Sequence, residues 1–247
     1  MPSQPPSPFS VASAPFGSAW IGDPRSQPLL QGLTVLAVED SRFACEALRL
    51  MCRRVGARLR RAETLDAARA HLRVYRPDVV IIDLGLPDGR GESLIRDLVL
   101  GSRRPPVILG TSGNPAGRAL ALAAGADEFL DKPLESLTAL CRALRPHLPE
   151  LDADWPQIRD DRVNPDPLAL RDDLQHAAAV LAQRPDPARQ RYVSGFLSGV
   201  ARHADDAALA AAAAEAGQDQ DPGLEGLRQL VDFRLAVPLD EFSLKPD

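Results

Sequence analysis

Long apolar runs are absent from this chain. No stretch approaches the roughly eighteen consecutive apolar residues of a membrane-spanning helix, and no basic stretch precedes an apolar one near the N-terminus. The sequence therefore gives no indication of a membrane span or a secretory signal. We expect a cytoplasmic protein without a membrane partner.

Cysteine is also scarce. The chain has three, Cys45, Cys52 and Cys141, at spacings unlike those of a zinc site, and all three fall on apolar positions of helical patterns. We expect reduced thiols in the protein core.

Lysine is nearly missing, because only Lys132 and Lys245 among the 29 basic residues are lysines. Charge is also unevenly distributed: residues 151–247 hold 10 basic and 18 acidic side chains, a net charge of −8. Such a segment repels a phosphate backbone, so we expect no nucleic-acid partner.

Composition divides the chain into four parts. Residues 1–31, rich in proline and serine, predict a disordered N-terminal arm. Residues 32–148 alternate short apolar runs with amphipathic stretches, residues 149–166 have the proline and aspartate content of a linker, and residues 167–247 show helical periodicity.

Five apolar runs in residues 32–148 predict β-strands with helices between them. They are Leu33–Val38, Ala57–Arg61, Asp78–Asp83, Val107–Thr111 and Glu128–Asp131. This alternation is typical of an α/β fold in which a doubly wound, five-stranded parallel sheet has helices on both faces. Functional sites in such sheets form at the carboxyl ends of the strands.

Acidic side chains stand at two of those ends. Glu39 and Asp40 follow the first strand and Asp83 ends the third. If the two strands are neighbours, three carboxylates meet at one edge, and a cation or a raised pKa must relieve their repulsion. Mg²⁺ prefers such oxygen ligands.

A hydroxyl and an ammonium group stand at the neighbouring strand ends. Thr111 ends the fourth strand, and Lys132 follows the fifth. Both could contact a phosphoryl group carried by one of the carboxylates. Because the chain otherwise relies on arginine, a lysine here indicates a need for a compact point charge.

Four motifs carry a resemblance to a known family. Val-Glu-Asp at 38–40, Ile-Asp-Leu-Gly-Leu-Pro-Asp-Gly at 82–89, Val-Ile-Leu-Gly-Thr-Ser at 107–112 and Gly-Ala-Asp-Glu-Phe-Leu-Asp-Lys-Pro at 125–133 resemble the receiver domain of response regulators, in order. The resemblance implies that Asp83 accepts a phosphoryl group from a histidine kinase or a histidine phosphotransfer protein.

The same resemblance implies roles for other site residues. Glu39, Asp40, Asp83 and the backbone carbonyl of Gly85 would hold Mg²⁺, and Lys132 would bind a phosphoryl oxygen. Receiver domains also have a cis peptide bond where this chain has Lys132-Pro133.

The family's conformational switch would fall on Thr111 and Phe129. Thr111 would move toward the phosphoryl group while the ring of Phe129 turns inward, changing the surface of the fourth helix, fifth strand and fifth helix, through which a homodimer could form. Phe129 stands where tyrosine is common, and Glu39 stands where many members have aspartate.

Such a domain is a substrate with catalytic groups and not a turnover enzyme. Phosphatases that use an aspartate nucleophile normally place a second acid two residues later, where this chain has Gly85. No glycine-rich nucleotide loop is present.

The C-terminal part predicts a small helical bundle or hairpin. Its apolar positions recur at helical spacing, at Leu170, Leu174, Ala177 and Leu181, at Val193, Phe196, Leu197 and Val200, at Leu209, and at Leu224, Leu227, Leu230, Val231 and Phe233. His176 and His203 invite a phosphotransfer interpretation, but neither is followed by the usual Lys-Gly. A packing or surface role is the alternative.

We therefore expect a phosphorylation-activated regulator whose output is a protein–protein interaction. A phosphate sink or shuttle, and a degenerate receiver that binds partners without phosphorylation, are alternatives.

Overall fold

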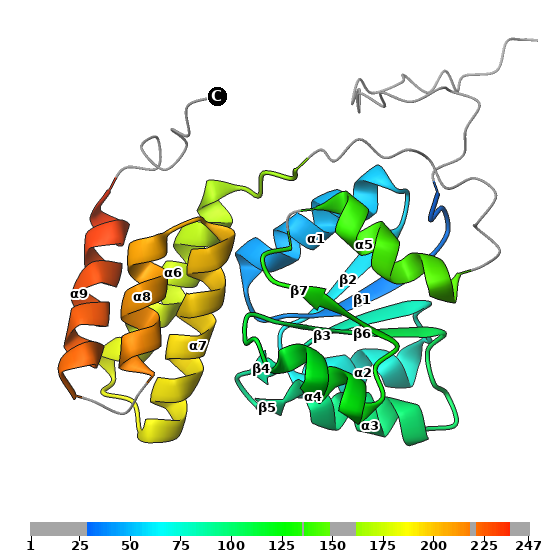
Figure 1. The fold of residues 1–247 in the computed structure, drawn as a ribbon, viewed down its shortest axis with the longest axis horizontal. Helices are drawn as coiled ribbons and strands as arrows, with labels where there is room; N and C mark the ends of the chain where they lie inside the picture. Colours follow the sequence, from blue (N-terminus) through cyan, green and yellow to red (C-terminus); the bar gives the residue numbers. More distant parts are fainter. Residues whose placement is uncertain (1–28, 135, 149–161, 218–220, 238–247) are drawn as a thin grey trace, which may run out of the picture.

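The computed structural model describes residues 29–134, 136–148, 162–217 and 221–237, which form a sheet domain and a separate helical bundle beside it (Figure 1). Most of the predicted N-terminal arm and most of the predicted linker lie outside these residues. Among the helices described, none combines the length and apolar composition needed to cross a bilayer.

The sheet domain has five parallel strands in the order β2-β1-β3-β6-β7. Its strands are β1 (Thr34–Val38), β2 (Arg58–Ala62), β3 (Val79–Asp83), β6 (Val107–Ser112) and β7 (Glu128–Asp131). The five predicted strands are thus confirmed, each to within one residue at either end. The order places β1 beside β3, so the carboxyl ends that carry the acidic residues are adjacent.

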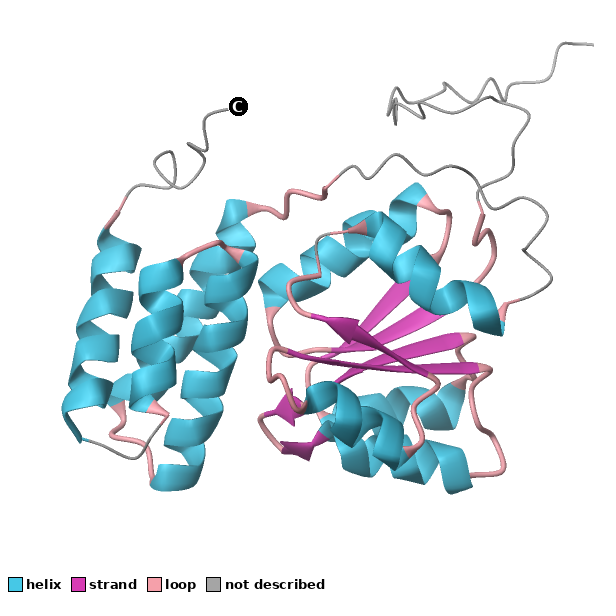
Figure 2. Cartoon of the chain, in the orientation of Figure 1, coloured by secondary structure: helices cyan, strands magenta, loops and turns pink. Residues whose placement is uncertain are grey.

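Helices cover both faces of this sheet, as predicted for a doubly wound fold (Figures 1 and 2). They are α1 (Arg42–Arg54), α2 (Leu65–Val74), α3 (Gly91–Leu100), α4 (Gly117–Ala124), α5 (Leu137–Leu144) and the short 3₁₀ helix η1 (Arg145–His147). Helices α1 and α5 lie on one face, and α2, α3 and α4 on the other. All five residues of β3 are buried, as expected for the central strand of a parallel sheet.

Hydroxyl side chains begin three of these helices. Ser41, Thr64 and Ser136 each accept a hydrogen bond from a backbone N–H of the first turn of α1, α2 and α5. Each capped helix therefore begins shortly after the carboxyl end of a strand, α1 after β1, α2 after β2 and α5 after β7.

A two-stranded hairpin follows β3, formed by β4 (Gly85–Leu86) and β5 (Gly89–Arg90). The chain then returns so closely to β3 that a Cβ atom on Gly91 would lie 2.1 Å from the carbonyl oxygen of Asp83. Glycine is required at this position because no side chain fits there.

Two predicted boundaries need correction. Leu30, assigned to the N-terminal arm, is 1% exposed and packs in the core beneath α1, and its N–H donates to the carbonyl of Val55. Val163, assigned to the linker, is 4% exposed in the same core, while its neighbour Arg162 pairs with Ser136. Single apolar residues inside polar segments gave no periodic signal, so these contacts escaped the sequence pattern.

The C-terminal part forms α6 (Pro167–Ala182), α7 (Pro187–His203), α8 (Ala207–Ala216) and α9 (Asp221–Ala236). Asp166, Asp186 and Asp206 cap the first three of these helices through hydrogen bonds to backbone N–H groups, and proline occupies the first turn of α6 and α7. We call these four helices the bundle.

The bundle buries most of the predicted apolar positions in one core. Phe233 is an exception: its residue is 59% exposed, because it projects from α9 on the side opposite the buried Leu227 and Val231. Phe233 therefore lies outside the bundle core, although its helical spacing placed it among the apolar positions predicted to form a bundle.

The three cysteines are free and buried, as predicted. Burial raises the pKa of each thiol to about 12. They are consequently poor nucleophiles at neutral pH.

Replacing a buried leucine of α7 should destabilise the bundle. Leu197 is fully buried in its core, so Leu197→Ala should lower the free energy of unfolding by about 2 to 5 kcal/mol through lost burial and a residual cavity. Leu168→Ala on α6 is the matched control, because Leu168 is 55% exposed. Urea denaturation of both variants measures the difference, and equal effects would contradict this description of the core.

Candidate functional site

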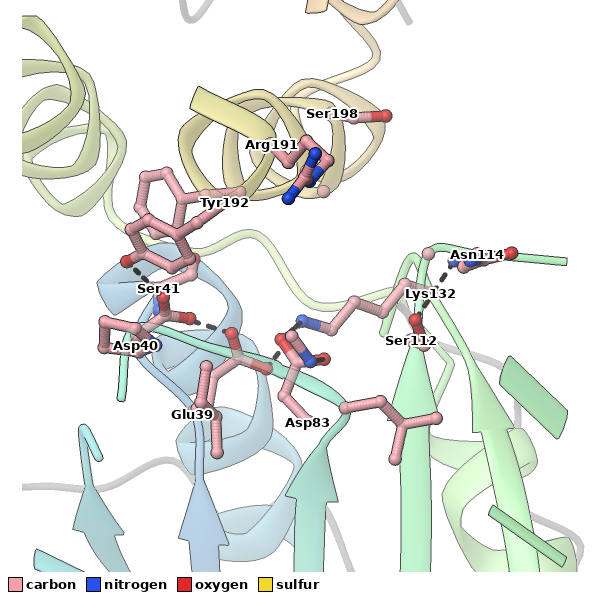
Figure 3. Close-up of a pocket in the computed structure, with 18 of the residues that line it drawn as sticks. Glu39, Asp40, Ser41, Asp83, Ser112, Asn114, Lys132, Arg191, Tyr192 and Ser198 are labelled. Carbon is pink, nitrogen blue, oxygen red and sulfur yellow. Dashed lines mark hydrogen bonds and ion pairs between the residues drawn. The ribbon is translucent and has the colours of Figure 1, made fainter. Parts of the chain in front are cut away.

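Three carboxylates meet at the carboxyl edge of the sheet. Glu39 and Asp40 follow β1, Asp83 ends β3, and each offers an oxygen within 4.8 Å of the others (Figure 3). Glu39 and Asp83 are buried, at 1% and 7% exposed. The three acids singled out in the sequence therefore form one cluster, as their strand positions predict.

Lys132, after β7, enters the same cluster. Its Nζ atom lies 2.6 Å from Oδ2 of Asp83 and 2.8 Å from Oε2 of Glu39, and its side chain is 5% exposed. Burial alone would lower the pKa of this ammonium group, but Asp83 and Glu39 outweigh burial and raise it, so Lys132 is charged. The Lys132-Pro133 peptide bond is cis, as predicted.

One ammonium does not neutralise three carboxylates. Burial raises the pKa of Glu39 to about 8, although Lys132 opposes the shift, and burial together with the charge of Asp83 raises the pKa of Asp40 to about 7. The cluster thus has an unmet need for positive charge.

These donors fit a hard divalent cation. Carboxylate oxygens at this separation are the ligands that Mg²⁺ prefers, and a cation would favour the charged forms that burial and the neighbouring carboxylates disfavour. Gly85, whose carbonyl is the fourth predicted ligand, borders the same cavity, and its N–H donates to Oδ1 of Asp83 over 3.2 Å.

Thr111 lies beside Asp83, on the neighbouring strand of the sheet. The two are paired in the register of β3 and β6, and Thr111 is fully buried. Its Oγ1 has no hydrogen-bond partner among the described residues, which is costly for a buried hydroxyl. Thr111 therefore carries, on the strand next to Asp83, a hydroxyl donor without a partner in the described part of the chain.

Phe129, the other predicted switch residue, points inward. It is 3% exposed, and Cβ atoms built on Gly110 and Gly117 would lie 3.3 and 3.1 Å from its ring. The guanidinium carbon of Arg118 lies 5.3 Å from the ring centroid, within the range of a cation–π contact. Glycine at both positions leaves room for the inward ring, because an added Cβ atom would contact it closely.

The bundle adds a residue that the sequence analysis did not identify. Tyr192 of α7 donates a hydrogen bond from its hydroxyl to Oδ2 of Asp40 over 2.7 Å (Figure 3). Burial and the nearby charge of Asp40 raise the pKa of Tyr192, so the hydroxyl keeps its proton. Its rarity was the only sequence signal, since the chain has two tyrosines.

Asp173 of α6 is a second unpredicted contact. Its carboxylate is 2% exposed and accepts hydrogen bonds from the hydroxyl of Ser41 at 2.7 Å and from the N–H groups of Arg42 at 2.8 Å and Phe43 at 3.1 Å. These groups begin α1, where a negative charge is favourable. Phe43 in turn packs into the core of the bundle.

His203, at the end of α7, has a structural contact. Its Nε2 accepts a hydrogen bond from the N–H of Leu134 over 2.8 Å, and its Nδ1 lies 3.0 Å from the carbonyl of Gly199. Burial lowers its pKa to about 4. His176 instead makes an edge-on contact with the ring of Phe196. His203 is thus a buried packing residue and His176 an exposed residue with one ring contact, which agrees with the packing or surface role.

A cavity of about 1040 Å³ lies between α7 and the acidic cluster. The cluster and Lys132 form its floor, and α7 supplies the facing wall. The structure therefore leaves room for a small group next to Asp83.

Comparison with known proteins gives a match for the sheet domain. The model of the response regulator receiver domain family matches residues 35–145. The Escherichia coli KDP operon transcriptional regulatory protein KdpE is 40% identical over 116 residues, which cover 46% of this chain and 52% of that protein. The Mycobacterium tuberculosis transcriptional regulatory protein KdpE is 32% identical over 130 residues, covering 51% and 58%.

A solved structure also matches this chain. A putative response regulator from Chloroflexus aurantiacus is 28% identical, covers 47% of this chain and 98% of that chain, and has a TM-score of 0.44. The chain spans about half the length of the curated relatives it matches. The family match ends at residue 145, before the bundle.

Acid should weaken the folded state through His203. Its pKa is about 4 in the folded protein and 6.5 ordinarily, so the stability that its neutral form contributes is present above pH 6.5 and is lost as the pH falls toward 4. This shift corresponds to about 3 kcal/mol.

His203→Gln keeps an acceptor but does not titrate, so it should lose about 3 kcal/mol less stability than the wild type between pH 7.5 and pH 4. Urea denaturation across this range measures the difference. His71→Gln on α2, in the sheet domain, is the control for replacing a histidine outside the bundle. Parallel curves for wild type and His203→Gln would contradict the assignment.

Proposed function

We propose, on the premise that residues 35–145 form a response-regulator receiver domain, that Asp83 is a phosphoryl acceptor and that the chain is a phosphorylation-activated regulator in a two-component phosphorelay. The observation that carries the proposal is the contact of Asp83 with Lys132, 2.6 Å apart within a cluster of three carboxylates. This arrangement joins a nucleophile, a charge that stabilises phosphoryl oxygens and a set of cation ligands.

In the proposed reaction, a carboxylate oxygen of Asp83 attacks the phosphorus atom of a phosphohistidine. The new O–P bond forms as the P–N bond breaks, and the histidine nitrogen leaves with the bonding electron pair. Lys132 stays close enough to hold an oxygen of the transferred group, and the unpartnered hydroxyl of Thr111 donates to another. The chain itself is the product, so it is a phosphorylated substrate and not a turnover enzyme.

Mg²⁺ would neutralise the negative charge that develops during transfer. Glu39, Asp40, Asp83 and the carbonyl of Gly85 are the groups that would hold it. The raised pKa values of Glu39 and Asp40 support this assignment, because burial first and the neighbouring carboxylates second disfavour their charged forms, which a bound cation would favour.

The donor would be a histidine kinase or a histidine phosphotransfer protein, and the output a protein–protein interaction. The acidic charge of residues 151–247 supports an output without nucleic acid. The relatives named transcriptional regulators match only about half of this chain, and the family model stops before the bundle. Exposed Leu120 and Leu122 on α4 support the alternative of a homodimer through α4, β7 and α5.

A phosphate sink or shuttle is the second candidate function. The intact receiver contacts support it equally well, because they require nothing of the bundle. Deleting residues 151–247 separates the two candidates: a sink keeps its effect on the relay, whereas an interaction output loses it.

Asp83→Asn should abolish phosphorylation. Wild-type protein incubated with acetyl phosphate should gain one phosphoryl group when Mg²⁺ is present, and this gain should be lost in Asp83→Asn because the amide is a poor nucleophile. Intact-mass spectrometry measures the product. Asp97→Asn, at an exposed ion pair between α3 and Arg69, is the control and should be labelled normally. Wild-type labelling of Asp83→Asn would overturn the assignment of the acceptor.

Lys132→Arg should impair phosphorylation although it keeps the charge. The Lys132 ammonium contacts Asp83 and Glu39 in a nearly closed space, where a planar guanidinium cannot take the same position. We expect the initial rate of labelling by acetyl phosphate to fall by about a hundredfold. Lys245→Arg, which changes the other lysine of the chain, is the control. An unchanged rate in Lys132→Arg would show that any positive charge suffices there.

A further inference from the structure

We propose that α7 and the carboxyl edge of the receiver form a phosphorylation-sensitive interface, in which Tyr192 latches the bundle over Asp83 and loading of the site with Mg²⁺ and a phosphoryl group opens it. The inference rests on the proposed function of Asp83. The carboxyl edge of the receiver is therefore occupied by the α6–α7 face of the same chain. This face is released when Mg²⁺ and a phosphoryl group are bound at the site.

The first part of the interface lies on the loop between β1 and α1. Tyr192 donates to Asp40 over 2.7 Å, and Asp173 accepts from Ser41, Arg42 and Phe43. Asp173 thus completes the N-terminus of α1 from another domain, and the buried ring of Phe43 anchors the receiver in the core of the bundle.

The other parts lie on two further loops around the acidic cluster. A side-chain N–H of Arg202 donates to the carbonyl of Gly113, after β6, and His203 accepts from the N–H of Leu134, after β7. Residues of α6 and α7 therefore hold three separate loops that surround Asp83.

Each of these contacts lies at or near a residue that phosphorylation would engage. Tyr192 binds Asp40, a proposed metal ligand. Gly113 lies two residues after Thr111, and Leu134 lies two residues after Lys132. If Thr111 and Lys132 move toward a phosphoryl group, the backbone positions that bind α7 move with them. Phosphorylation of the site and docking of the bundle therefore compete.

Charge favours the same direction of change. Arg189, Arg191 and Arg202 of α7 border the cavity above the acidic cluster (Figure 3 shows Arg191). They face the three carboxylates of the acidic cluster, of which Lys132 contacts two. A bound divalent cation adds more positive charge than the phosphoryl group adds negative charge, so the loaded site attracts these arginines less than the carboxylates alone do.

The interface also restricts the access of phosphodonors to Asp83. The Asp83 side chain is 10% exposed, and α7 lies across the cavity above it. Gly195 and Gly199 border this cavity, and a Cβ atom on either would meet nothing within 4 Å. A small phosphodonor therefore has room to enter, whereas a histidine on a folded protein reaches Asp83 only after α7 has moved.

Backbone amides of the receiver report this interface directly. The N–H groups of Arg42 and Phe43 bind Asp173, and that of Leu134 binds His203, so their exchange with solvent should be slow while the bundle is docked. We would measure amide hydrogen exchange in the full chain, alone, with Mg²⁺, and with Mg²⁺ and acetyl phosphate. The intact mass of the same samples would be recorded.

Exchange at these three amides should become at least tenfold faster in the sample that carries a phosphoryl group. Without phosphorylation, Tyr192→Phe should accelerate them by roughly tenfold, the expected effect of losing one hydrogen bond to a charged group. Tyr75→Phe changes the other tyrosine, which caps the C-terminus of α2 in the sheet domain. This control should have no effect on the exchange of the three amides.

The outcomes separate this inference from the proposed function. A wild-type sample without a phosphoryl group on Asp83 would overturn the proposed function. A sample that carries the phosphoryl group but shows unchanged or slower exchange at Arg42, Phe43 and Leu134 would overturn the latch alone. Exchange in Tyr192→Phe equal to that in Tyr75→Phe would exclude Tyr192 as the residue that holds the interface closed.

Discussion

The burial of three carboxylates around one lysine is the constraint on which the rest of the structure depends. Charged groups taken out of water are costly unless they are paired, and Lys132 pairs with only two of the three acids. Burial, together with the neighbouring carboxylates, raises the pKa values of Glu39 and Asp40. A site with this imbalance favours a divalent cation and responds strongly when another charge is added. Such sensitivity suits a protein that changes state by accepting one phosphoryl group.

The fold supplies this constraint through strand order. A parallel sheet in which β1 lies beside β3 brings Glu39, Asp40 and Asp83 to one edge, while β6 and β7 bring Thr111 and Lys132 to the same edge. Gly91 then lets the chain return against Asp83, and the glycines around Phe129 let its ring pack inward. The residues of the proposed site thus share a small volume because of backbone geometry and not because they are close in sequence.

Much of this could be predicted from the sequence because the signals are local and periodic. Short apolar runs defined the five strands, and the polar residues directly after them defined the cluster. The docking of the bundle could not be predicted in this way. Tyr192 is 152 residues from Asp40, and Asp173 is 132 residues from Ser41, so their contacts depend on how two finished surfaces fit. Leu30 shows the same limit at a single position, since periodicity says nothing about one residue outside a regular pattern. Phe233 shows that an apolar residue at helical spacing need not be buried.

The central claim is that Asp83 is the residue that carries the phosphoryl group. Reduction of the phosphorylated protein with borohydride converts an acyl phosphate to an alcohol, and peptide mapping then locates the altered side chain. Protein phosphorylated with acetyl phosphate and Mg²⁺ should be altered at residue 83. Alteration at another acidic residue, with Asp83 intact, would contradict it.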